Sequence, residues 1–586
     1  MVSTRTSTGS GRRSTFKMTP TSKGGDGDSA RGRASPVGPS SKKAPVTSRS
    51  PSPAVSPQKR SKKTSEAHAE VVALASPSSS PSSKSKPKSA AKMTSPKTSP
   101  APKKRTYTKK TDGLPPPPPP PASPPPKRAY NKKPKNTAAG KGPSHGHGDW
   151  TNQSGMRGTG LYAVLSTLGA LALILSTCPA AIYLWFLHEK MGGDCAAFYD
   201  FYQKNGIKGL YNEWPTPSAE AWGYVAGFAV LTATIQLLMP GKPFDGPVTP
   251  KGNVPKYKAN GVQSFLFTHA LFFATWYLGY FNPARVHELL GEIIAATNLF
   301  ALGFCAMLTL KGHFAPSSSD SGGCGNLIFD FYWGTELYPR IGPLDLKMFT
   351  NCRWGMMLWS LLPLCYTARQ MELYGSPSAA MLVSVILTEV YVFKFFVWEA
   401  GYMKSIDIMH DRAGYYICWG CLVWVPSLYT SPSLYFVRNP GAISLATAAF
   451  MLFAGLLMIW VNYDADRQRA DFRTANGLCN VWGKPAKFIK AKYVTASGQT
   501  KESLLLLSGY WGMSRHFHYL PEILASFFWS VPGLFKHISP YFYVIFLTIL
   551  LVDRAHRDDG RCAGKYGKFW DQYKKQVSYW IVPGVY

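Results

Sequence analysis

The feature that most constrains this chain is a series of apolar stretches, each close to the length that crosses a membrane. About 20 consecutive apolar residues span the hydrocarbon core of a bilayer as a helix. A single stretch of this kind could be the buried helix of a soluble protein, but a long series excludes that class. Six clear stretches occupy 161–187, 219–239, 261–281, 289–310, 379–398 and 442–461, and four shorter or interrupted ones occupy 355–374, 415–429, 517–531 and 538–552. The sequence therefore predicts an all-α polytopic membrane protein with about ten transmembrane helices.

The chain before these stretches has a different composition. Residues 1–150 hold 30 Lys and Arg against 6 Asp and Glu, and their only aromatic residues are Phe16, Tyr107, Tyr130 and Trp150. So little apolar surface cannot offset the entropy of ordering, which predicts a disordered basic tail over 1–149 with polyproline segments. We expect its basic clusters to contact anionic surfaces or proline-reading domains, with no nucleic acid required for catalysis. A plain solvated spacer is the alternative.

Basic segments also predict the orientation of the membrane part. The segment 464–501 holds eight Lys and Arg, and 554–575 holds seven. Both, together with the basic tail, are expected on the cytoplasmic side, and an even number of crossings makes this assignment self-consistent. The cysteines would then be intramembrane or cytosolic, and reduced. Cys418 and Cys421 have CxxC spacing but no second pair of ligands, so we interpret them as structural and predict no metal site.

Charged residues within the apolar stretches indicate a functional interior. Glu389, Lys394 and Glu399 lie within or at the end of one stretch, where charges are costly unless they face protein or a wet cavity. The segment 407–416 follows with six aromatic or titratable side chains in ten residues. Two interpretations remain open, a reaction cavity or an interfacial group of ion pairs that fixes helix packing. For a reaction cavity the candidate proton donors are Asp407, His410 and Asp411.

The C-terminal third combines cations, aromatic rings and an acid. Arg469 and Arg473 are four residues apart just after an apolar stretch, so one helical face would carry both guanidiniums. Arginine suits bidentate contacts to phosphate. Aromatic residues such as Trp511 could hold a flat ring, and Asp558 could hold a sugar hydroxyl. The pattern fits a nucleotide, although positive-inside residues alone would also place basic groups here.

The residues that carry a family resemblance lie in the same region. They are the strings LLLLSGYWGMSRHFHY at 504–519, YPRIG at 338–342, DRAHRDDGRCAGKYG at 553–567 and YWIVPG at 579–584. From about residue 160 onward the chain resembles the sterol reductases that act on ring double bonds. His518 and the pair Pro521–Glu522 stand where many members have Asn and Gly-Asp, and are similar to the plant-type Δ7-sterol reductase branch. The string DIMHDRAGYYICWGC at 407–421 is also similar to that branch.

The resemblance implies a ten-helix reductase of the endoplasmic reticulum membrane that uses NADPH in sterol biosynthesis. The expected domains are the tail at 1–149 and a reductase domain at 150–586, whose part 462–586 forms the NADPH pocket. Arg469 stands where many members have Lys, which keeps the charge and changes the geometry. The expected cofactor contacts are Arg469, Arg473, Leu506, Trp511, His518, Tyr519, Asp558, Cys562, Ala563, Gly564, Lys565, Tyr566 and Tyr573.

The expected substrate is a Δ5,7-sterol, taken from the membrane lipid and reduced at C7–C8 by a proton and a hydride. Three alternatives remain at this point. The same scaffold could carry a Δ14- or C24(28)-sterol reductase, because pocket shape decides which bond reacts. A membrane methyltransferase could have a related cofactor site. A tethering protein resembling the lamin B receptor would also have a basic tail, but the complete set of Arg469, Arg473, Trp511 and Asp558 argues against a degenerate site.

Overall fold

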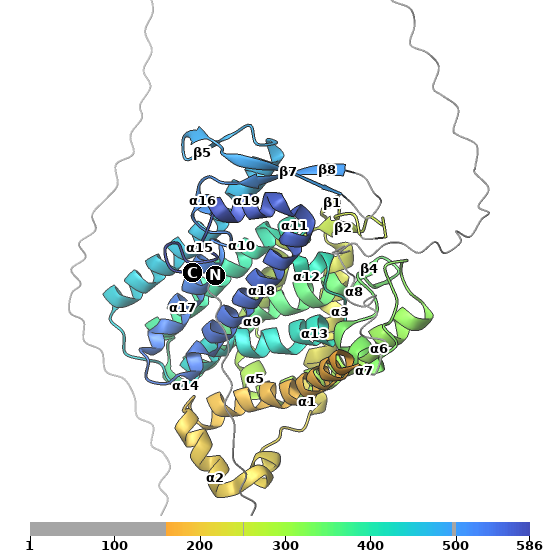
Figure 1. Ribbon diagram of the computed structural model, residues 1–586. Coiled ribbons are helices and arrows are strands. Elements are labelled where there is room, and N and C mark those ends of the chain that lie inside the picture. The colour runs from red at the N-terminus through yellow and green to blue at the C-terminus, as the bar shows by residue number, and fades with distance from the viewer. Residues whose placement is uncertain (1–159, 250, 495–499) are drawn as a thin grey trace, which may run out of the picture. The chain divides into compact units, whose positions relative to one another are not determined.

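The structure is a computed structural model that describes residues 160–249, 251–494 and 500–586. All of these residues belong to one compact unit, Asn131–Tyr586. The described part is mainly helical, with short strand pairs (Figure 1). The predicted tail at 1–149 lies outside the described residues, so its disorder stays a prediction.

Five of the described helices are long and apolar enough to cross a membrane. They match five of the six clear apolar stretches of the sequence; the sixth, 261–281, forms a helix of 17 residues that is too short to be counted with them. These helices are α1 (Leu161–Lys190), α3 (Ala219–Leu238), α6 (Leu290–Phe314), α10 (Ala379–Val397) and α15 (Leu445–Thr474).

The other predicted stretches also form helices, but shorter, broken or more polar ones. They are α4 (Gly261–Tyr277), α9 (Met356–Tyr374), α13 (Tyr415–Trp419) with η4 (Gly420–Tyr429), α17 (Tyr519–Ser530) and α18 (Phe542–Tyr566). Pro363 lies inside α9 and Pro426 inside η4. Because only five helices meet the length and hydropathy of a span, the membrane character is supported and the number ten stays a prediction.

Serine residues begin three of the long helices. The side chains of Ser218, Ser378 and Ser444 accept hydrogen bonds from the backbone N–H groups of the first turns of α3, α10 and α15, at 3.1–3.2 Å. Such N-caps satisfy donors that have no partner within the helix. The sequence thereby fixes where each helix begins, and α15 then packs along both α10 and α17.

Two π-helical segments cross closely in the interior. They are η3 (Phe349–Gly355), which leads into α9, and η4. A Cβ added at Gly355 would lie 2.7 Å from the carbonyl oxygen of Cys421, so only glycine allows this approach. Trp354, which is 1% exposed, donates from Nε1 to the carbonyl of Leu422 at 3.0 Å. Such π segments are often found at functional sites.

The predicted intramembrane charges all have protein partners. Glu389 accepts a hydrogen bond from Ser360 at 2.6 Å, and Lys394 donates to Asn462 at 2.6 Å. Glu399 pairs with Arg353 at 2.6 Å, and both side chains are at most 2% exposed. These charges therefore face the protein interior, as the sequence predicts.

The C-terminal region adds a β-hairpin that the all-α prediction did not include. Strands β7 (Phe488–Val494) and β8 (Thr500–Leu506) pair antiparallel, with Phe488 opposite Leu506. The hairpin packs against α18 and α19 (Lys568–Gln576), as Figure 1 shows. Ala491 and Leu505 share a small core with Trp570 and Tyr573.

Shorter elements complete the described fold. The helices are α2 (Cys195–Asn212), α5 (Pro283–Glu288), α7 (Leu327–Trp333), α8 (Leu346–Met348), α11 (Glu399–Tyr402), α12 (Ile406–Met409), α14 (Ser431–Arg438), α16 (Tyr510–Met513), η5 (Val531–Gly533) and η6 (Ser539–Tyr541). The antiparallel pairs are β1 (Lys242–Asp245) with β2 (Lys256–Ala259), β3 (Arg340–Ile341) with β4 (Leu344–Asp345), and β5 (Asn480–Val481) with β6 (Lys484–Pro485).

Candidate functional site

The end of α15 presents a guanidinium to an indole ring. The guanidinium carbon of Arg469 lies 3.9 Å from the ring centroid of Trp511. Trp511 is 4% exposed and donates from Nε1 to the carbonyl of Ala465 at 2.8 Å, which fixes the ring against α15. Arg473 lies one turn further along the same helix. Both predicted cations, Arg469 and Arg473, therefore lie on α15. The guanidinium of Arg469 also stacks on Trp511, the predicted aromatic contact.

A tight backbone turn at Gly509 positions Trp511. The φ angle of Gly509 is +63°, and a Cβ added there would lie 2.1 Å from the amide oxygen of Gln468. That oxygen accepts the backbone N–H of Tyr510 at 3.1 Å. The positive φ favours glycine at 509, and a larger residue would have to displace the Gln468 side chain that holds this turn.

Three rings continue the cluster beyond Trp511. The ring centroids of Trp511 and His518 are 4.9 Å apart, those of His518 and Tyr519 are 4.3 Å apart, and His516 stacks on Tyr519 at 5.2 Å. Burial lowers the pKa of His516 to about 4, against the opposing effect of the nearby Asp558 carboxylate, so this ring is neutral at pH 7. Within the described structure, His516 Nε2 and His518 Nδ1 are buried without a hydrogen-bond partner. Buried ring nitrogens of this kind are suited to contact a polar ligand.

Helices α18 and α19 supply the other side of the cluster. The hydroxyl of Tyr573 donates to the carbonyl of Trp511 at 3.2 Å. Asp558 accepts from Arg561 Nε at 2.9 Å, and Cys562 Sγ is 3.8 Å from the other oxygen of Asp558. The Tyr573 bond brings α19 to the backbone of Trp511, and the effect of the Asp558 carboxylate on the pKa of His516 places α18 beside the same cluster.

The remaining predicted contacts line the hairpin side of the same helices. Leu506 packs in one core cluster with Trp511. The hydroxyl of Tyr566 lies 3.3 Å from Ser503 on β8, and Lys565 Nζ lies 4.4 Å from the ring centroid of Tyr493. Ala563 packs against the core around Trp570 and Tyr573. Gly564 follows it on α18, directly before Lys565. All predicted cofactor contacts therefore lie on α15, β8, α16, α17, α18 and α19 or the turn before α17.

The candidate proton donors dock along an arginine face of α18. Asp407 pairs with Arg554 at 2.8 Å, Asp411 with Arg557 at 3.7 Å, and His410 Nε2 lies 3.5 Å from Arg561. The three arginines are spaced by three and four residues, which places them on one helical face. Arg554, Arg557 and Arg561 therefore each pair with an acidic side chain of the protein. Their charges do more than set the orientation of the chain in the membrane.

Asp411 differs from the other two candidate proton donors, Asp407 and His410, in its burial. It is 2% exposed, and its Oδ2 atom has no hydrogen-bond partner within the described structure. Burial, reinforced by the negative charge of Asp407, raises the pKa of Asp411 to about 6, although Arg557 and Lys347 oppose the shift. Lys347 also donates to the backbone carbonyl of Asp411 and thereby holds the loop. A buried carboxyl group with this pKa can be protonated near neutral pH.

The two groups of residues meet at Arg561. Its guanidinium binds Asp558 of the predicted cofactor cluster and lies against His410 of the predicted proton-donor segment. The sequence analysis did not connect these segments, which are about 150 residues apart. Their proximity supports one site with two chemical functions.

Sequence reasoning missed a polar chain that leads from His518 into the membrane part. Asn462 donates from Nδ2 to the carbonyl of His518 at 2.8 Å, and its Oδ1 accepts from Lys394 Nζ at 2.6 Å. Lys394 lies 4.4 Å from the ring centroid of Tyr391, whose hydroxyl donates to Glu522. The available signals were a charge at Glu522 within one apolar stretch and a polar residue, Asn462, directly after another.

The structure gives no support to metal chemistry at the cysteines. Among the described residues, no group of three or more His, Cys, Asp or Glu side chains could hold a metal ion. All ten cysteines, which lie in the described ranges, are free thiols.

Comparison with known proteins gives one family. The model of the Ergosterol biosynthesis ERG4/ERG24 family matches residues 153–586. The chain is 52% identical over 428 residues to a protein of Arabidopsis thaliana named 7-dehydrocholesterol reductase, which covers 73% of this chain and 99% of that protein. It is 39% identical over 345 residues to a protein of the same name from Xenopus laevis, covering 58% of this chain and 73% of that protein.

A relative with another name is more distant. The chain is 33% identical over 425 residues to a protein of Methylotuvimicrobium alcaliphilum named Delta(14)-sterol reductase, covering 71% of this chain and 94% of that protein. The family match covers the whole described part, including the helices of membrane-spanning length and the site around Trp511. This multi-pass membrane protein belongs to the Ergosterol biosynthesis ERG4/ERG24 family of sterol reductases.

Proposed function

We propose that this chain reduces the C7–C8 double bond of Δ5,7-sterols in sterol biosynthesis, with NADPH as the reductant. The observation that carries the proposal is the 52% identity to the Arabidopsis thaliana 7-dehydrocholesterol reductase over nearly all of that protein. Identity to the Delta(14)-sterol reductase is 33% over a similar length, which favours the first substrate class. The plant-type residues His518 and Glu522 lie within the site, and support the same choice.

The residues of segment 462–586 fit a dinucleotide phosphate. Arg469 and Arg473 would hold phosphate groups, and Asp558 would accept from a ribose hydroxyl. The rings of Trp511 and Tyr519 offer flat apolar faces, and the orphaned nitrogens of His516 and His518 offer polar contacts. When bound, NADPH supplies the hydride. The protein's part is to bind the cofactor, orient it and keep the interior dry.

The proposed proton donor is Asp411. Of the three candidates, Asp407 is held by Arg554 and His410 lies against Arg561, whereas Asp411 has an unpartnered carboxyl oxygen and a pKa of about 6. Protonation of the sterol at C8 leaves an allylic cation at C7, which the C5–C6 double bond delocalises. Hydride addition at C7 then completes the reduction. A donor pKa near the working pH suits the proton transfer.

The proposed location is the endoplasmic reticulum membrane, with about ten crossings and segments 464–501 and 554–575 on the cytoplasmic side. This orientation follows from their excess of Lys and Arg. The sterol would enter from the membrane lipid. The tail at 1–149 is proposed to contact anionic surfaces or proline-reading domains without taking part in catalysis.

Expression in cells whose membranes accumulate Δ5,7-sterols, and which have no Δ7-reductase of their own, tests the proposal. We expect the diene to decrease and the corresponding Δ5-sterol to appear when sterol extracts are analysed by mass spectrometry. Cells with the Asp411→Asn variant at equal membrane abundance serve as the control, and should keep most of the diene. An unchanged diene in cells with the full chain would contradict the proposal.

A further inference from the structure

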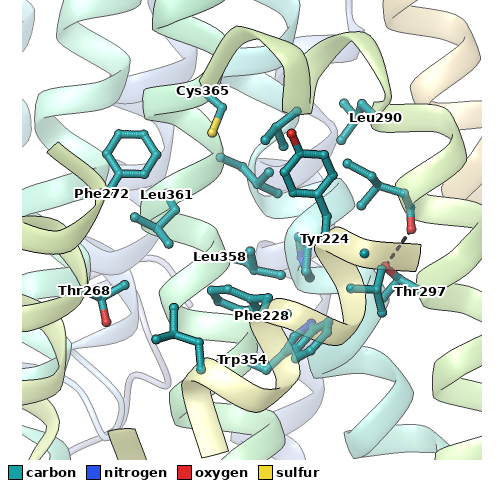
Figure 2. A pocket seen from close by; sticks show the side chains of 18 of the residues that line it. Tyr224, Phe228, Thr268, Phe272, Leu290, Thr297, Trp354, Leu358, Leu361 and Cys365 are labelled. Carbon is teal, nitrogen blue, oxygen red and sulfur yellow. Dashed lines mark hydrogen bonds between the residues drawn. The ribbon is translucent and has the colours of Figure 1, made fainter. Parts of the chain in front are cut away.

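A cavity of about 410 Å³ lies in the membrane part, between α3, α4, α6, α9 and η4. This volume is within the range of about 300–1,000 Å³ that is usual for pockets of small organic ligands. Aromatic and aliphatic side chains form its wall, among them Phe228, Phe272, Trp354 and Leu361 (Figure 2). None of its lining residues, which all lie in the described ranges, carries a charge.

The cavity is distinct from the site around α18. Leu358 of α9 lines the cavity, while the next residue, Trp359, contacts Tyr543 of α18 at 5.6 Å between ring centroids. Val423 of η4 lines the cavity, while Trp424 contacts Phe546 of α18 at 5.9 Å. Helix α9 and segment η4 therefore form a wall with the cavity on one side and α18 on the other. No residue of the 407–411 segment or of the predicted cofactor contacts lines the cavity.

Two glycines of α3 leave room for a ligand. Gly223 and Gly227 line the cavity one helical turn apart, and a Cβ added at either would meet no atom within 4 Å. Glycines in membrane helices commonly allow a second helix to approach closely. Among the described residues no helix makes that approach, so the glycines widen the cavity instead of tightening a contact.

Three hydroxyl groups on the wall, those of Tyr224, Tyr280 and Ser427, make no hydrogen bond among the described residues, and only that of Ser427 is fully buried. Ser427 is 5% exposed, and its Oγ atom makes no hydrogen bond within the described structure. Thr268 and Thr297, which also line the cavity, donate to carbonyls of their own helices at 2.8 Å and 2.7 Å. A buried polar group without a partner is costly, so a ligand hydroxyl beside Ser427 would be favoured.

We propose that this cavity binds one 3-hydroxysterol, with the sterol hydroxyl at Ser427, in a site separate from the reaction site. A rigid apolar ring system fits uncharged walls of Phe, Trp and Leu, and its one hydroxyl can pair with Ser427, the fully buried hydroxyl of the wall that has no partner. A phospholipid headgroup or a fatty-acid carboxylate would need a charged partner, which the wall lacks. The proposal goes beyond the reaction itself and concerns binding that does not need NADPH.

Photolabelling of the full chain in lipid nanodiscs tests the site. The probe is a cholesterol analogue with a diazirine on ring B and a free 3-hydroxyl, and labelled peptides are mapped by mass spectrometry. We expect labels on α3, α9 and η4 that excess cholesterol removes. Cholesterol 3-methyl ether, which cannot donate to Ser427, should compete about fivefold less well, the effect of one neutral hydrogen bond.

Matched glycine variants separate filling of the cavity from general disturbance. Both glycines are exposed, and at both an added Cβ meets nothing within 4 Å, but only Gly227 lines the cavity; Gly227→Leu therefore adds a side chain to the cavity wall, and Gly303→Leu adds the same side chain to α6 away from it. Gly227→Leu should abolish the label on α9 and η4, and Gly303→Leu should keep it. Both variants should retain NADPH-dependent sterol turnover and the melting temperature of the original chain.

Several results would overturn the proposal. Absence of label from α3, α9 and η4 in the original chain would exclude a sterol here, and equal competition by a fatty acid would show a site for any apolar chain. Loss of turnover in Gly227→Leu at an unchanged melting temperature would show that the cavity belongs to the reaction site. Failure of the original chain to reduce sterols would contradict the proposed function alone, because labelling does not depend on turnover.

Discussion

Arg469 is the residue through which α15 meets the proposed cofactor site. Its guanidinium stacks on Trp511 at 3.9 Å, and its nearest acidic group is Asp466 at 3.3 Å. A guanidinium with only a moderate ion pair remains able to bind phosphate. Arg467, two residues earlier, is instead engaged by Asp464 at 2.5 Å and is 52% exposed.

Replacing Arg469 or Arg473 by Ala should weaken NADPH binding. A lost charge-assisted contact costs about 1.5–3 kcal/mol, which raises the KM for NADPH about 10- to 100-fold. Steady-state kinetics in membranes measure this change, with Arg467→Ala as the control on the same helix. An unchanged KM in both variants would show that the phosphates bind elsewhere.

Asp411 should set the pH dependence of the reaction. Only the protonated carboxyl group can donate, and its pKa is about 6. The protonated fraction therefore falls about tenfold for each pH unit well above 6, and kcat should decrease in the same way. The Asp411→Asn variant should lose most of kcat, and its residual rate should no longer follow this pH dependence.

Asp553 provides the control for that experiment. It binds the same arginine, Arg557, at 2.9 Å, but is 62% exposed. Asp553→Asn should retain the original pH profile. If Asp411→Asn kept the original kcat and profile, another group would have to donate the proton.

At the level of elements, α18 joins the two halves of the site. Its arginines at 554, 557 and 561 contact the 407–411 segment, and Asp558 faces the cofactor cluster. Sequence reasoning predicted both segments, because charge near apolar stretches and Arg at helical spacing have local causes. It could not predict that they meet at Arg561, because that contact depends on how distant helices pack.

The hairpin β7–β8 shows a different limit of sequence reasoning. Lys490 and Lys492 alternate with the buried Ala491, which is the period-two pattern of a half-buried strand. The prediction counted these lysines as orienting charges and did not use their alternation. The helical stretches were predicted more completely, because a long apolar run is a stronger signal than a seven-residue alternation.

The buried pair between η3 and α11 should be important for stability. Arg353 and Glu399 are 2.6 Å apart and almost fully buried, and Glu399 also accepts the backbone N–H of Gly261 at 2.9 Å. Removal of one partner leaves an uncompensated buried charge, which costs about 3–5 kcal/mol. The Glu399→Ala variant should therefore melt at a clearly lower temperature in detergent.

An exposed ion pair gives the comparison. Glu220 and Arg285 are 2.7 Å apart, and each side chain is 44% exposed. Exposed pairs contribute little to stability, so Glu220→Ala should leave the melting temperature nearly unchanged. Equal effects of the two variants would contradict a stabilising role for the buried pair.

For the whole molecule, we expect the tail to be dispensable for catalysis. Residues 1–149 have little apolar content, and the family match begins at residue 153. The basic segments at 464–501 and 554–575 remain to set the orientation. A chain that starts near Trp150 should insert and reduce sterol at nearly the full rate, compared at equal membrane abundance.

Any effect of the tail should be on location. Contacts between its basic clusters and an anionic surface would be weak and salt-sensitive, because screening acts over about 8 Å at physiological ionic strength. A large loss of specific activity in the shortened chain would show instead that the tail contributes to the active fold.

The double bond that is reduced distinguishes a Δ7-reductase from a Δ14-reductase, and a comparison of two substrates decides between them. Microsomes that contain the full chain are incubated with NADPH and either 7-dehydrocholesterol or a Δ14-sterol, and the products are separated by gas chromatography and identified by mass spectrometry. We expect conversion of 7-dehydrocholesterol to cholesterol and little reduction of the Δ14-sterol. Reduction of the Δ14-sterol with 7-dehydrocholesterol left unchanged would contradict the proposed function.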